Sequence, residues 1–276
     1  MTPIFTEPLK TERIDIAIAD LPVDLIGTKI IQLSDLHYDG KHLSEEVFEE
    51  AIAKCNREQA DLIVLTGDLI TNKPEPIPQL AQKLQQLNSR FGIYGCLGNH
   101  DSYFPNTKKQ LITALKAVGV IILLNEVSYP LGEQIALVGL ADFWTRDFKP
   151  SKILPQIEPQ LPRIVLSHNP DTATILAKYR VDLQLSGHTH GGQVIIPGYG
   201  AAPALLQDIR KNTPKFISQY IPYLRNCSKV VKNWQWSEGW HQIGNNQLYV
   251  NRGLGTYFPG RFLCPPEITV ITLERK

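Results

Sequence analysis

Residues 62–69 read LIVLTGDL, a continuous apolar run that ends in Gly67 and Asp68. An unbroken β-branched run is typical of a strand that is buried on both faces of a sheet. Similar apolar runs precede and follow it, at 29–33, 91–97 and 120–124. Helical patterns, with apolar residues three and four positions apart, alternate with these runs at 44–59, 78–88 and 107–118. The first half of the chain therefore predicts strands that alternate with helices.

The second half of the chain is richer in strands. We expect a hairpin, a helix and five more strands, at 127–130 with 134–140, at 171–179, and at 163–167, 183–186, 193–196, 247–251 and 268–273. A βαβα half followed by a mostly β half predicts an α/β fold in which a two-sheet β-sandwich is flanked by helices. We find no repeats, so we expect a single domain over 1–276 with a cap-like insertion at about 197–246.

The composition is that of an ordinary globular protein. Apolar residues make up 43% of the 276, and 28 Lys and Arg against 27 Asp and Glu give a net charge of +1. A balanced charge argues against an extended nucleic-acid surface, so no nucleic-acid partner is expected. No CxxC pair is present, and Cys55 and Cys96 lie in apolar stretches that predict buried thiols. With no secretory pattern at the N-terminus and no run of about 18 apolar residues, a cytoplasmic location is favoured.

Polar motifs follow five of the predicted strands. They are SDLH at 34–37, GD at 67–68, GNHD at 98–101, SHN at 167–169 and GHTHGG at 187–192. The carboxyl ends of parallel strands meet at one crevice, which would gather Asp35, His37, Asp68, Asn99, His168, His188 and His190. Carboxylate, amide and imidazole ligands without thiolate suit Mn²⁺, Fe or Zn²⁺. Seven ligands are too many for one ion and suit two that share a bridging carboxylate.

The order of these motifs resembles that of the calcineurin-like metallophosphoesterases. Their pattern is D-x-H, GD, GNHD or GNHE, a lone H, and GHxH, and all five blocks are intact over roughly 29–273. The spellings SDLH, GHTHGGQV, VNRGLGT and PPEITVITL are most similar to a bacterial branch with a Tat-exported Bacillus phosphoesterase and UDP-diacylglucosamine diphosphatases. The chain departs from the exported members because the signal or anchor expected at the N-terminus is missing.

The resemblance implies hydrolysis of a phosphate ester by a hydroxide that bridges two divalent ions. The first ion would be held by Asp35, His37, Asp68 and His190. The second would be held by Asp68, Asn99, His168 and His188, with Asp68 as the bridge. His100 would protonate the leaving oxygen, and Asp101 would orient His100, with a helix or turn cap as the alternative for Asp101. The alternative function is a non-catalytic scaffold with this fold. Such a scaffold could lose metal ligands without consequence, and none of the ligand positions is lost in this sequence.

Other polar residues near the motifs are candidates for further roles. Arg252 and Arg261 are candidates for binding a second phosphate, with surface arginines as the alternative. Asn169 and Asp171 are expected to cap the helix that follows them, and Asp142 is a weaker candidate for approaching the site. The expected substrate is a phosphodiester or a diphosphate, including a nucleotide-linked lipid such as UDP-2,3-diacylglucosamine.

The segment 203–240 is basic and aromatic. Its cations are Arg210, Lys211, Lys215, Arg225, Lys229 and Lys232. Its larger aromatic residues are Phe216, Tyr220, Tyr223, Trp234, Trp236 and Trp240. We weigh three interpretations: a lid with its own small core, a cap that contacts an amphiphilic substrate or the membrane surface, and a surface that stacks on nucleic-acid bases. The second would add peripheral contact with the inner membrane.

Overall fold

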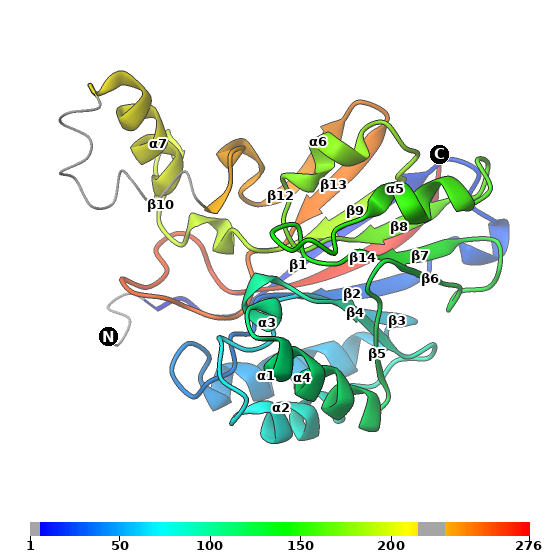
Figure 1. The fold of residues 1–276 in the computed structure, drawn as a ribbon, viewed down its shortest axis with the longest axis horizontal. Helices are drawn as coiled ribbons and strands as arrows, with labels where there is room; N and C mark the ends of the chain where they lie inside the picture. Colours follow the sequence, from blue (N-terminus) through cyan, green and yellow to red (C-terminus); the bar gives the residue numbers. More distant parts are fainter. Residues whose placement is uncertain (1–5, 215–229) are drawn as a thin grey trace.

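Two six-stranded sheets form the centre of the protein, which the computed structural model describes over residues 6–214 and 230–276 (Figure 1). The first sheet has the order β1-β14-β2-β3-β4-β5, with bounds Lys10–Ile18, Glu267–Arg275, Lys29–Leu33, Leu62–Thr66, Ile93–Cys96 and Val120–Ile122. The second has the order β12-β13-β9-β8-β7-β6, with bounds Gly239–Ile243, Asn246–Val250, Leu183–Ser186, Arg163–Leu166, Ala136–Gly139 and Glu126–Ser128. A small hairpin pairs β10 (Ile195–Ile196) with β11 (Gly200–Ala201).

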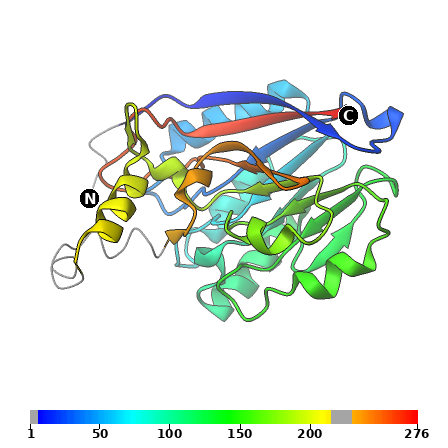
Figure 2. The ribbon, with the colours of Figure 1, turned by 90° about the horizontal axis from the view of Figure 1, so that it is seen from above.

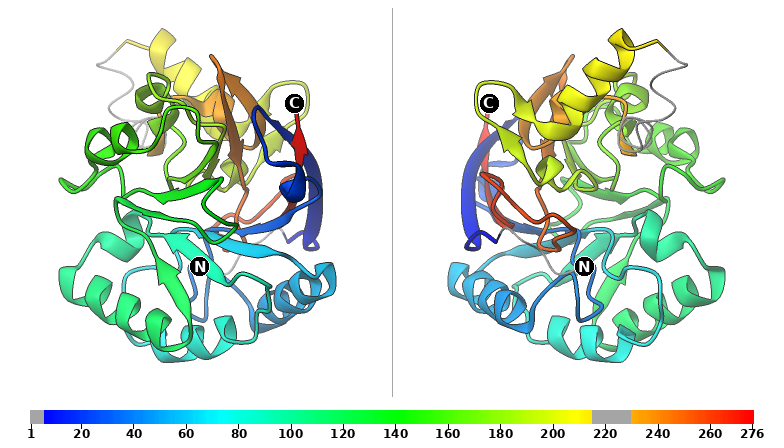
Figure 3. Two further views of the ribbon diagram at one scale, coloured as in Figure 1. Left: turned by 90° about the vertical axis from the view of Figure 1, so that its right-hand side faces the viewer. Right: turned by 90° about the vertical axis from the view of Figure 1, so that its left-hand side faces the viewer.

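Helices cover the outer faces of both sheets (Figures 1 and 3). The first sheet is covered by α1 (Glu45–Glu58), α2 (Ile77–Leu84) and α4 (Pro105–Ala117). The second is covered by α5 (Pro150–Ile153) and α6 (Thr172–Leu176), with the 3-10 turn η2 (Leu154–Gln156). The remaining elements are α3 (Asn99–Ser102), α7 (Ala202–Asn212), and the 3-10 turns η1 (Val23–Leu25), η3 (His190–Gly192) and η4 (Trp234–Trp236). The fold is thus the predicted two-sheet sandwich flanked by helices.

Alternation along the strands separates two cores. In β2, Ile30 faces the second sheet and packs in one cluster with Ile164 of β8. The next residue, Ile31, packs with Phe48 of α1 on the outer face. Successive side chains of a strand point to opposite faces, so a continuous apolar strand supplies both cores at once. The predicted buried thiols are confirmed, and Cys227 lies outside the described residues.

Most element bounds agree with the sequence prediction within a few residues, and two differences matter. β1 is absent from the strands that the sequence predicts, although its IDIAI segment alternates between apolar and other residues. It pairs in parallel with β14 at the edge of the first sheet. β12 was included in the predicted insertion, but it pairs with β13 and belongs to the second sheet.

The segment that protrudes is therefore shorter than expected. Among the described residues, the β10–β11 hairpin and α7 extend beyond the end of both sheets (Figure 2), and residues 230–238 lead from this region back to β12. We call these described residues together the protruding segment. Lys215, Phe216, Tyr220, Tyr223, Arg225 and Lys229, which were part of the predicted basic and aromatic segment, lie outside the described residues. Among the helices that the structure describes, none has the length and apolar character to cross a bilayer.

Candidate metal centre

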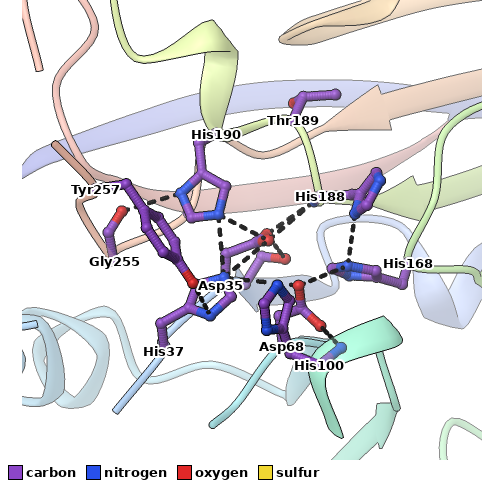
Figure 4. Close-up of polar contacts among 12 residues, drawn as sticks. Asp35, His37, Asp68, His100, His168, His188, Thr189, His190, Gly255 and Tyr257 are labelled. Carbon is purple, nitrogen blue, oxygen red and sulfur yellow. Dashed lines mark hydrogen bonds and ion pairs between the residues drawn. The ribbon is translucent and has the colours of Figure 1, made fainter. Parts of the chain in front are cut away.

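The predicted ligands come together at one edge of the sandwich (Figure 4). Strands β2, β3 and β4 run parallel in the first sheet, as do β8 and β9 in the second. Their carboxyl ends point to the same edge, so the loops that follow them converge there. Six candidate side chains, those of Asp35, His37, Asp68, His168, His188 and His190, are all less than 10% exposed.

The backbone makes unusual turns at these positions. Asp35, His37, Asp68, His188 and His190 all have positive φ, between 43° for His37 and 73° for His188. A positive φ is uncommon outside glycine, and such strain is concentrated at functional sites. Of the ten described non-glycine residues with positive φ, five are candidate ligands, so the unusual backbone conformations are concentrated at this site.

One group of candidate ligands consists of Asp35, His37 and His190, whose ligand atoms lie within 4.8 Å of one another. The Nε2 atoms of the two histidines are 3.1 Å apart, and Asp35 Oδ1 lies 3.4 Å from His190 Nε2 and 3.9 Å from His37 Nε2. Asp35 Oδ2 accepts hydrogen bonds from Ser34 Oγ and from the His188 backbone. These contacts fix the carboxylate while Oδ1 faces the two imidazoles.

A second group consists of Asp68, His168 and His188, which meet the same distance limit. His168 Nε2 lies 3.1 Å from Asp68 Oδ2 and 3.1 Å from His188 Nδ1. The same Asp68 oxygen lies 3.6 Å from His37 Nε2, in the first group. Asp68 Oδ1 is held by the backbone N–H of His100 at 2.9 Å. One carboxylate oxygen therefore lies between the two groups, where a bridging ligand would be needed.

Asn99 supplies an independent indication of a missing partner. Its side-chain oxygen Oδ1 is buried and has no hydrogen-bond partner among the described residues. A buried polar atom without a partner costs free energy and calls for an explanation such as a bound ion. An amide oxygen is a suitable ligand for a divalent cation. Together with the carboxylates and imidazoles, this atom shows that the residues present fit a metal centre.

Backbone carbonyls fix the orientation of three imidazoles from outside the centre. His168 Nδ1 is 2.7 Å from the Thr66 carbonyl, and His190 Nδ1 is 3.0 Å from the Gly255 carbonyl. His188 Nε2 is 3.0 Å from the Val230 carbonyl. A carbonyl can only accept, so each of these nitrogens carries the proton and the other faces the centre. This is the usual arrangement around metal-binding histidines.

The electrostatics of the site follow from burial. Burial lowers the pKa of His37 and that of His190 to about 3, and the pKa of His188 to about 4, so these rings are neutral at physiological pH. Burial would also lower the pKa of His168, but the Asp68 carboxylate outweighs it and raises that pKa to about 10. A neutral imidazole is the metal-binding form, so an ion bound beside His168 must displace a proton.

Two glycines allow the loops to approach the carboxylates. A Cβ atom on Gly98 would lie 2.1 Å from Asp68 Oδ1, and one on Gly187 would lie 2.2 Å from Asp35 Oδ2. No other residue fits at such distances. The glycines of the GNHD and GHTH motifs are therefore required by the packing around the two carboxylates.

His100 lies beside the first and second groups. Its ring nitrogen Nδ1 donates to the Thr71 carbonyl at 2.6 Å, and its ring lies with His37 and Asp68 in a third group whose ligand atoms are within 4.8 Å of one another. The predicted orienting role of Asp101 is not what the contacts show. The buried Asp101 carboxylate instead accepts from the backbone N–H groups of Leu69, Ile70 and Gly98. These hydrogen bonds connect the loop that contains the GD motif with the loop that contains the GNHD motif. The role of Asp101 is therefore closer to the predicted alternative, a helix or turn cap.

Arg252 and Arg261 are held within the protein, in contrast to the predicted phosphate contacts. Arg252 forms ion pairs with Glu12, Glu238 and Glu267. Arg261 is 1% exposed and donates to backbone carbonyls. Both guanidiniums are therefore engaged by partners within the protein, which corrects the predicted phosphate contacts.

The other polar candidates differ in their placement. Asn169 Oδ1 accepts from the Asp171 backbone N–H at 2.9 Å, so Asn169 shapes the turn before α6 and does not cap the helix as predicted. The Asp171 side chain makes no cap hydrogen bond to α6. It accepts instead from the backbone N–H groups of Lys232 and Asn233, and so anchors the segment that leads into η4. Asp142 is buried, and its charge acts on the nearby His168.

Two aromatic residues at the site were missed in the sequence. The Tyr257 hydroxyl lies 3.0 Å from His37 Nδ1, and the Trp144 ring packs edge-on against His188 at 4.9 Å between ring centres. Tyr257 lies in the GTYF stretch that follows β13, and its position after a strand end is the one signal that could have found it. Trp144 is half exposed, in the loop that carries Asp142.

An apolar pocket of about 280 Å³ adjoins the metal centre. Its walls include Pro203, Leu206, Val230 and Trp234 from the protruding segment, above His188, His190 and Tyr257. Trp234 is buried, and Trp236 is partly buried against Val250 of β13 and its neighbours. These two tryptophans therefore pack inward, and Trp240 is the one that is exposed.

Comparison with known proteins agrees with this geometry. Residues 28–192 match the calcineurin-like phosphoesterase family. An uncharacterised metallophosphoesterase of Bacillus subtilis, YkuE, is 35% identical over 92% of this chain and 82% of its own length. Phosphodiesterase YaeI of Escherichia coli is 32% identical over 89% of this chain and 82% of its own length.

A UDP-2,3-diacylglucosamine pyrophosphatase of Chlamydia muridarum, LpxG, is 29% identical over 95% of this chain and 88% of its own length. Among solved structures, TT1561 of Thermus thermophilus has the same fold, with a TM-score of 0.51, 11% identity and coverage of 82% of this chain and 90% of its own. The family match spans more than half of the chain and includes every candidate ligand. The chain therefore belongs to the calcineurin-like phosphoesterase family and is a metal-dependent phosphoric ester hydrolase.

Proposed function

We propose that this hydrolase is dinuclear and that Asp68 bridges its two ions. Asp35, His37 and His190 would complete the first ion's ligands, and Asn99, His168 and His188 the second's. The observation that carries the proposal is the position of Asp68 Oδ2, 3.6 Å from His37 Nε2 and 3.1 Å from His168 Nε2. Mn²⁺, Fe and Zn²⁺ all suit these ligand types.

The ions and the protein have separate parts in the reaction. Bound divalent ions would neutralise the phosphate oxygens and activate water for attack on phosphorus. His100 would hold the proton for the leaving oxygen, since its Nδ1 donates to Thr71 and its Nε2 remains for the substrate. The backbone N–H of His100 meanwhile holds Asp68 Oδ1, so one residue positions the bridge and serves the leaving group.

A non-catalytic scaffold is the competing function, and metal content separates the two. We expect about two transition-metal ions per chain after mild purification without chelators, measured by elemental analysis. Replacement of Asp68 by Asn should reduce this content, whereas His241→Ala, a change on β12 remote from the centre, should leave it unchanged. A wild-type protein without stoichiometric metal would support the scaffold.

The adjoining pocket supports a substrate with an apolar substituent. The pocket has a mostly apolar lining, and two of its residues, His188 and His190, are candidate ligands. A phosphodiester or diphosphate bound at the ions could therefore place an apolar group beneath α7. The relative named as a UDP-2,3-diacylglucosamine pyrophosphatase has such a substrate, with acyl chains beside a diphosphate. We include peripheral contact with the cytoplasmic face of the inner membrane in this proposal, because a lipid-linked substrate is drawn from a membrane.

A substrate panel and one pair of variants test this part. We expect hydrolysis of an aryl phosphodiester and of UDP-2,3-diacylglucosamine, with less hydrolysis of an aryl phosphomonoester. Leu206→Asp places a charge in the pocket, and Leu205→Asp changes its neighbour on α7, which is not part of the pocket lining. Leu206→Asp should raise KM for the lipid substrate about tenfold or more and leave the aryl diester unaffected, because lost uniform binding raises KM alone. Equal losses for both substrates would contradict the apolar subsite.

A further inference from the structure

Arg261 is among the largest fully buried side chains, at 1% exposure. No carboxylate oxygen of residues 6–214 or 230–276 lies within ion-pair distance of its guanidinium. A buried cation without such a partner is costly unless neutral polar groups surround it. Here the guanidinium is surrounded by backbone carbonyls.

The carbonyls that Arg261 binds come from the loop after β13 and from the GHTH motif. Nη2 donates to Arg252, Gly253 and Gly255 at 2.8, 3.0 and 2.7 Å. Nη1 lies 3.3 Å from the Cys264 carbonyl and 3.5 Å from the His190 carbonyl. Nε donates to Thr256 Oγ1 at 3.1 Å. These are six contacts for five N–H groups, so one Nη2 hydrogen is shared between two carbonyls. A planar guanidinium can make such a set of bonds, and a lysine ammonium with three N–H groups cannot.

The loop that Arg261 holds is a wall of the first ligand group. A Cβ atom on Gly253 would lie 2.6 Å from Asp35 Cβ, so this backbone packs directly on the carboxylate residue. The Gly255 N–H donates to the Asp35 carbonyl at 2.7 Å. The Gly255 carbonyl accepts from His190 Nδ1 at 3.0 Å, and the same oxygen accepts from Arg261. Arg261 and His190 therefore share one carbonyl.

We propose that Arg261 is a positioning residue that holds His190 in its metal-binding orientation through the Gly255 carbonyl. The inference rests on the proposed dinuclear function and adds an asymmetry to it. Arg261 supports the group of Asp35, His37 and His190. The other group is oriented independently, because His168 donates to Thr66 and His188 donates to Val230. Loss of the guanidinium should weaken one ion site and spare the other.

A matched control exists in the second sheet. Arg163 is also buried, at 3% exposure, and also donates to backbone carbonyls, those of Leu154, Glu158 and Leu161. It begins β8, whereas the candidate ligand His168 follows the end of that strand. Arg163→Lys therefore removes the same kind of hydrogen bonds between a buried guanidinium and backbone carbonyls, but at a distance from the metal centre.

The test is a titration of metal-free protein with Mn²⁺. Binding is measured by calorimetry or by the electron paramagnetic resonance signal of Mn²⁺. Wild type should bind two ions. Arg261→Lys should lose about 10–100-fold in affinity at one ion, the usual cost of removing an outer hydrogen bond, and keep the other. Arg163→Lys should bind both ions as wild type does. In ¹⁵N NMR spectra of the metal-free wild type, the Nδ1–H of His190 should be visible because its hydrogen bond slows exchange with water. In Arg261→Lys this signal should be lost.

Thr256→Val provides a milder variant that keeps the guanidinium and removes one acceptor, for use if Arg261→Lys does not fold. It should lower affinity for one ion by a few-fold. The inference is overturned if Arg261→Lys or Thr256→Val retains both affinities, or if both ions weaken equally. A wild-type protein that binds a single ion would instead contradict the proposed dinuclear function.

Discussion

The loops that follow β2, β3, β4, β8 and β9 carry the candidate ligands, and we call them the floor of the metal centre. This floor and the protruding segment beside it are attached to the fold in different ways. In the floor, each candidate carboxylate is fixed by backbone N–H groups from another strand end, as His188 fixes Asp35 and His100 fixes Asp68. The described part of the protruding segment is held mainly through its own backbone, which binds side chains of the sandwich. The Asp171 carboxylate accepts from the backbone at Lys232, and the Val230 carbonyl accepts from His188. The difference indicates that the candidate ligands are built into the sandwich, whereas the adjoining apolar pocket depends on a segment that is added beside it.

The strongest way to break the floor is to change its shared carboxylate. Asp68→Asn removes a charge that faces both ligand groups, and an amide cannot neutralise two cations. Metal-ion charge stabilisation is worth several kcal/mol in the transition state, so turnover should fall by at least about 10³-fold with the fold retained. Circular dichroism and metal analysis provide the checks. Near-normal turnover with two bound ions would show that Asp68 is not the bridge.

A change at His100 should be smaller and selective. His100→Ala removes the ring that donates to Thr71 but leaves the backbone N–H on Asp68, so metal content should stay at wild-type level. A general acid contributes about 10²–10⁴-fold, so alkoxide leaving groups should lose about that much and nitrophenolate much less. The comparison of kcat for the two leaving groups tests this. Equal losses would reject the general-acid role.

Asp101 should affect stability more than chemistry. Asp101→Ala leaves three backbone N–H groups without their acceptor, each at a cost of about 1–3 kcal/mol, so the free energy of unfolding should fall by several kcal/mol. Asp101→Asn should cost less, because its amide oxygen can still accept from Leu69 and Ile70. Denaturant titration measures both variants. If Asp101→Ala kept wild-type stability and showed the same dependence on the leaving group as His100→Ala, the role of Asp101 would be to orient His100.

The smallest effect is expected where the protruding segment is anchored. Asp171→Ala removes the acceptor for the backbone at Lys232 and Asn233, and hydrogen exchange at these two amides should become faster. KM for a lipid-linked substrate should rise a few-fold, and turnover of a small aryl diester should not change. A comparable loss for both substrates would show that the segment also supports the floor.

The same contrast explains what could be predicted from the sequence. The candidate ligands follow strand ends in short motifs, so local patterns are enough to predict that Asp35, Asp68 and the three late histidines come together. The sequence carries no such signal for the partners of Arg252 and Arg261. Arg252 pairs with Glu12 on β1, which is far along the chain, and Arg261 binds carbonyls of a neighbouring loop whose course around the guanidinium depends on the fold. No local pattern reveals such partners. Tyr257 was missed for the same reason, since only the fold brings its hydroxyl to His37.

The central claim is that two ions share Asp68, and crystals of the Mn²⁺-loaded protein would test it most directly through anomalous scattering. The account predicts two peaks about 3.5–4 Å apart. Asp68 Oδ2 should lie between them, with His190 beside one peak and His168 beside the other. A single peak, or two peaks that share no carboxylate, would contradict the account.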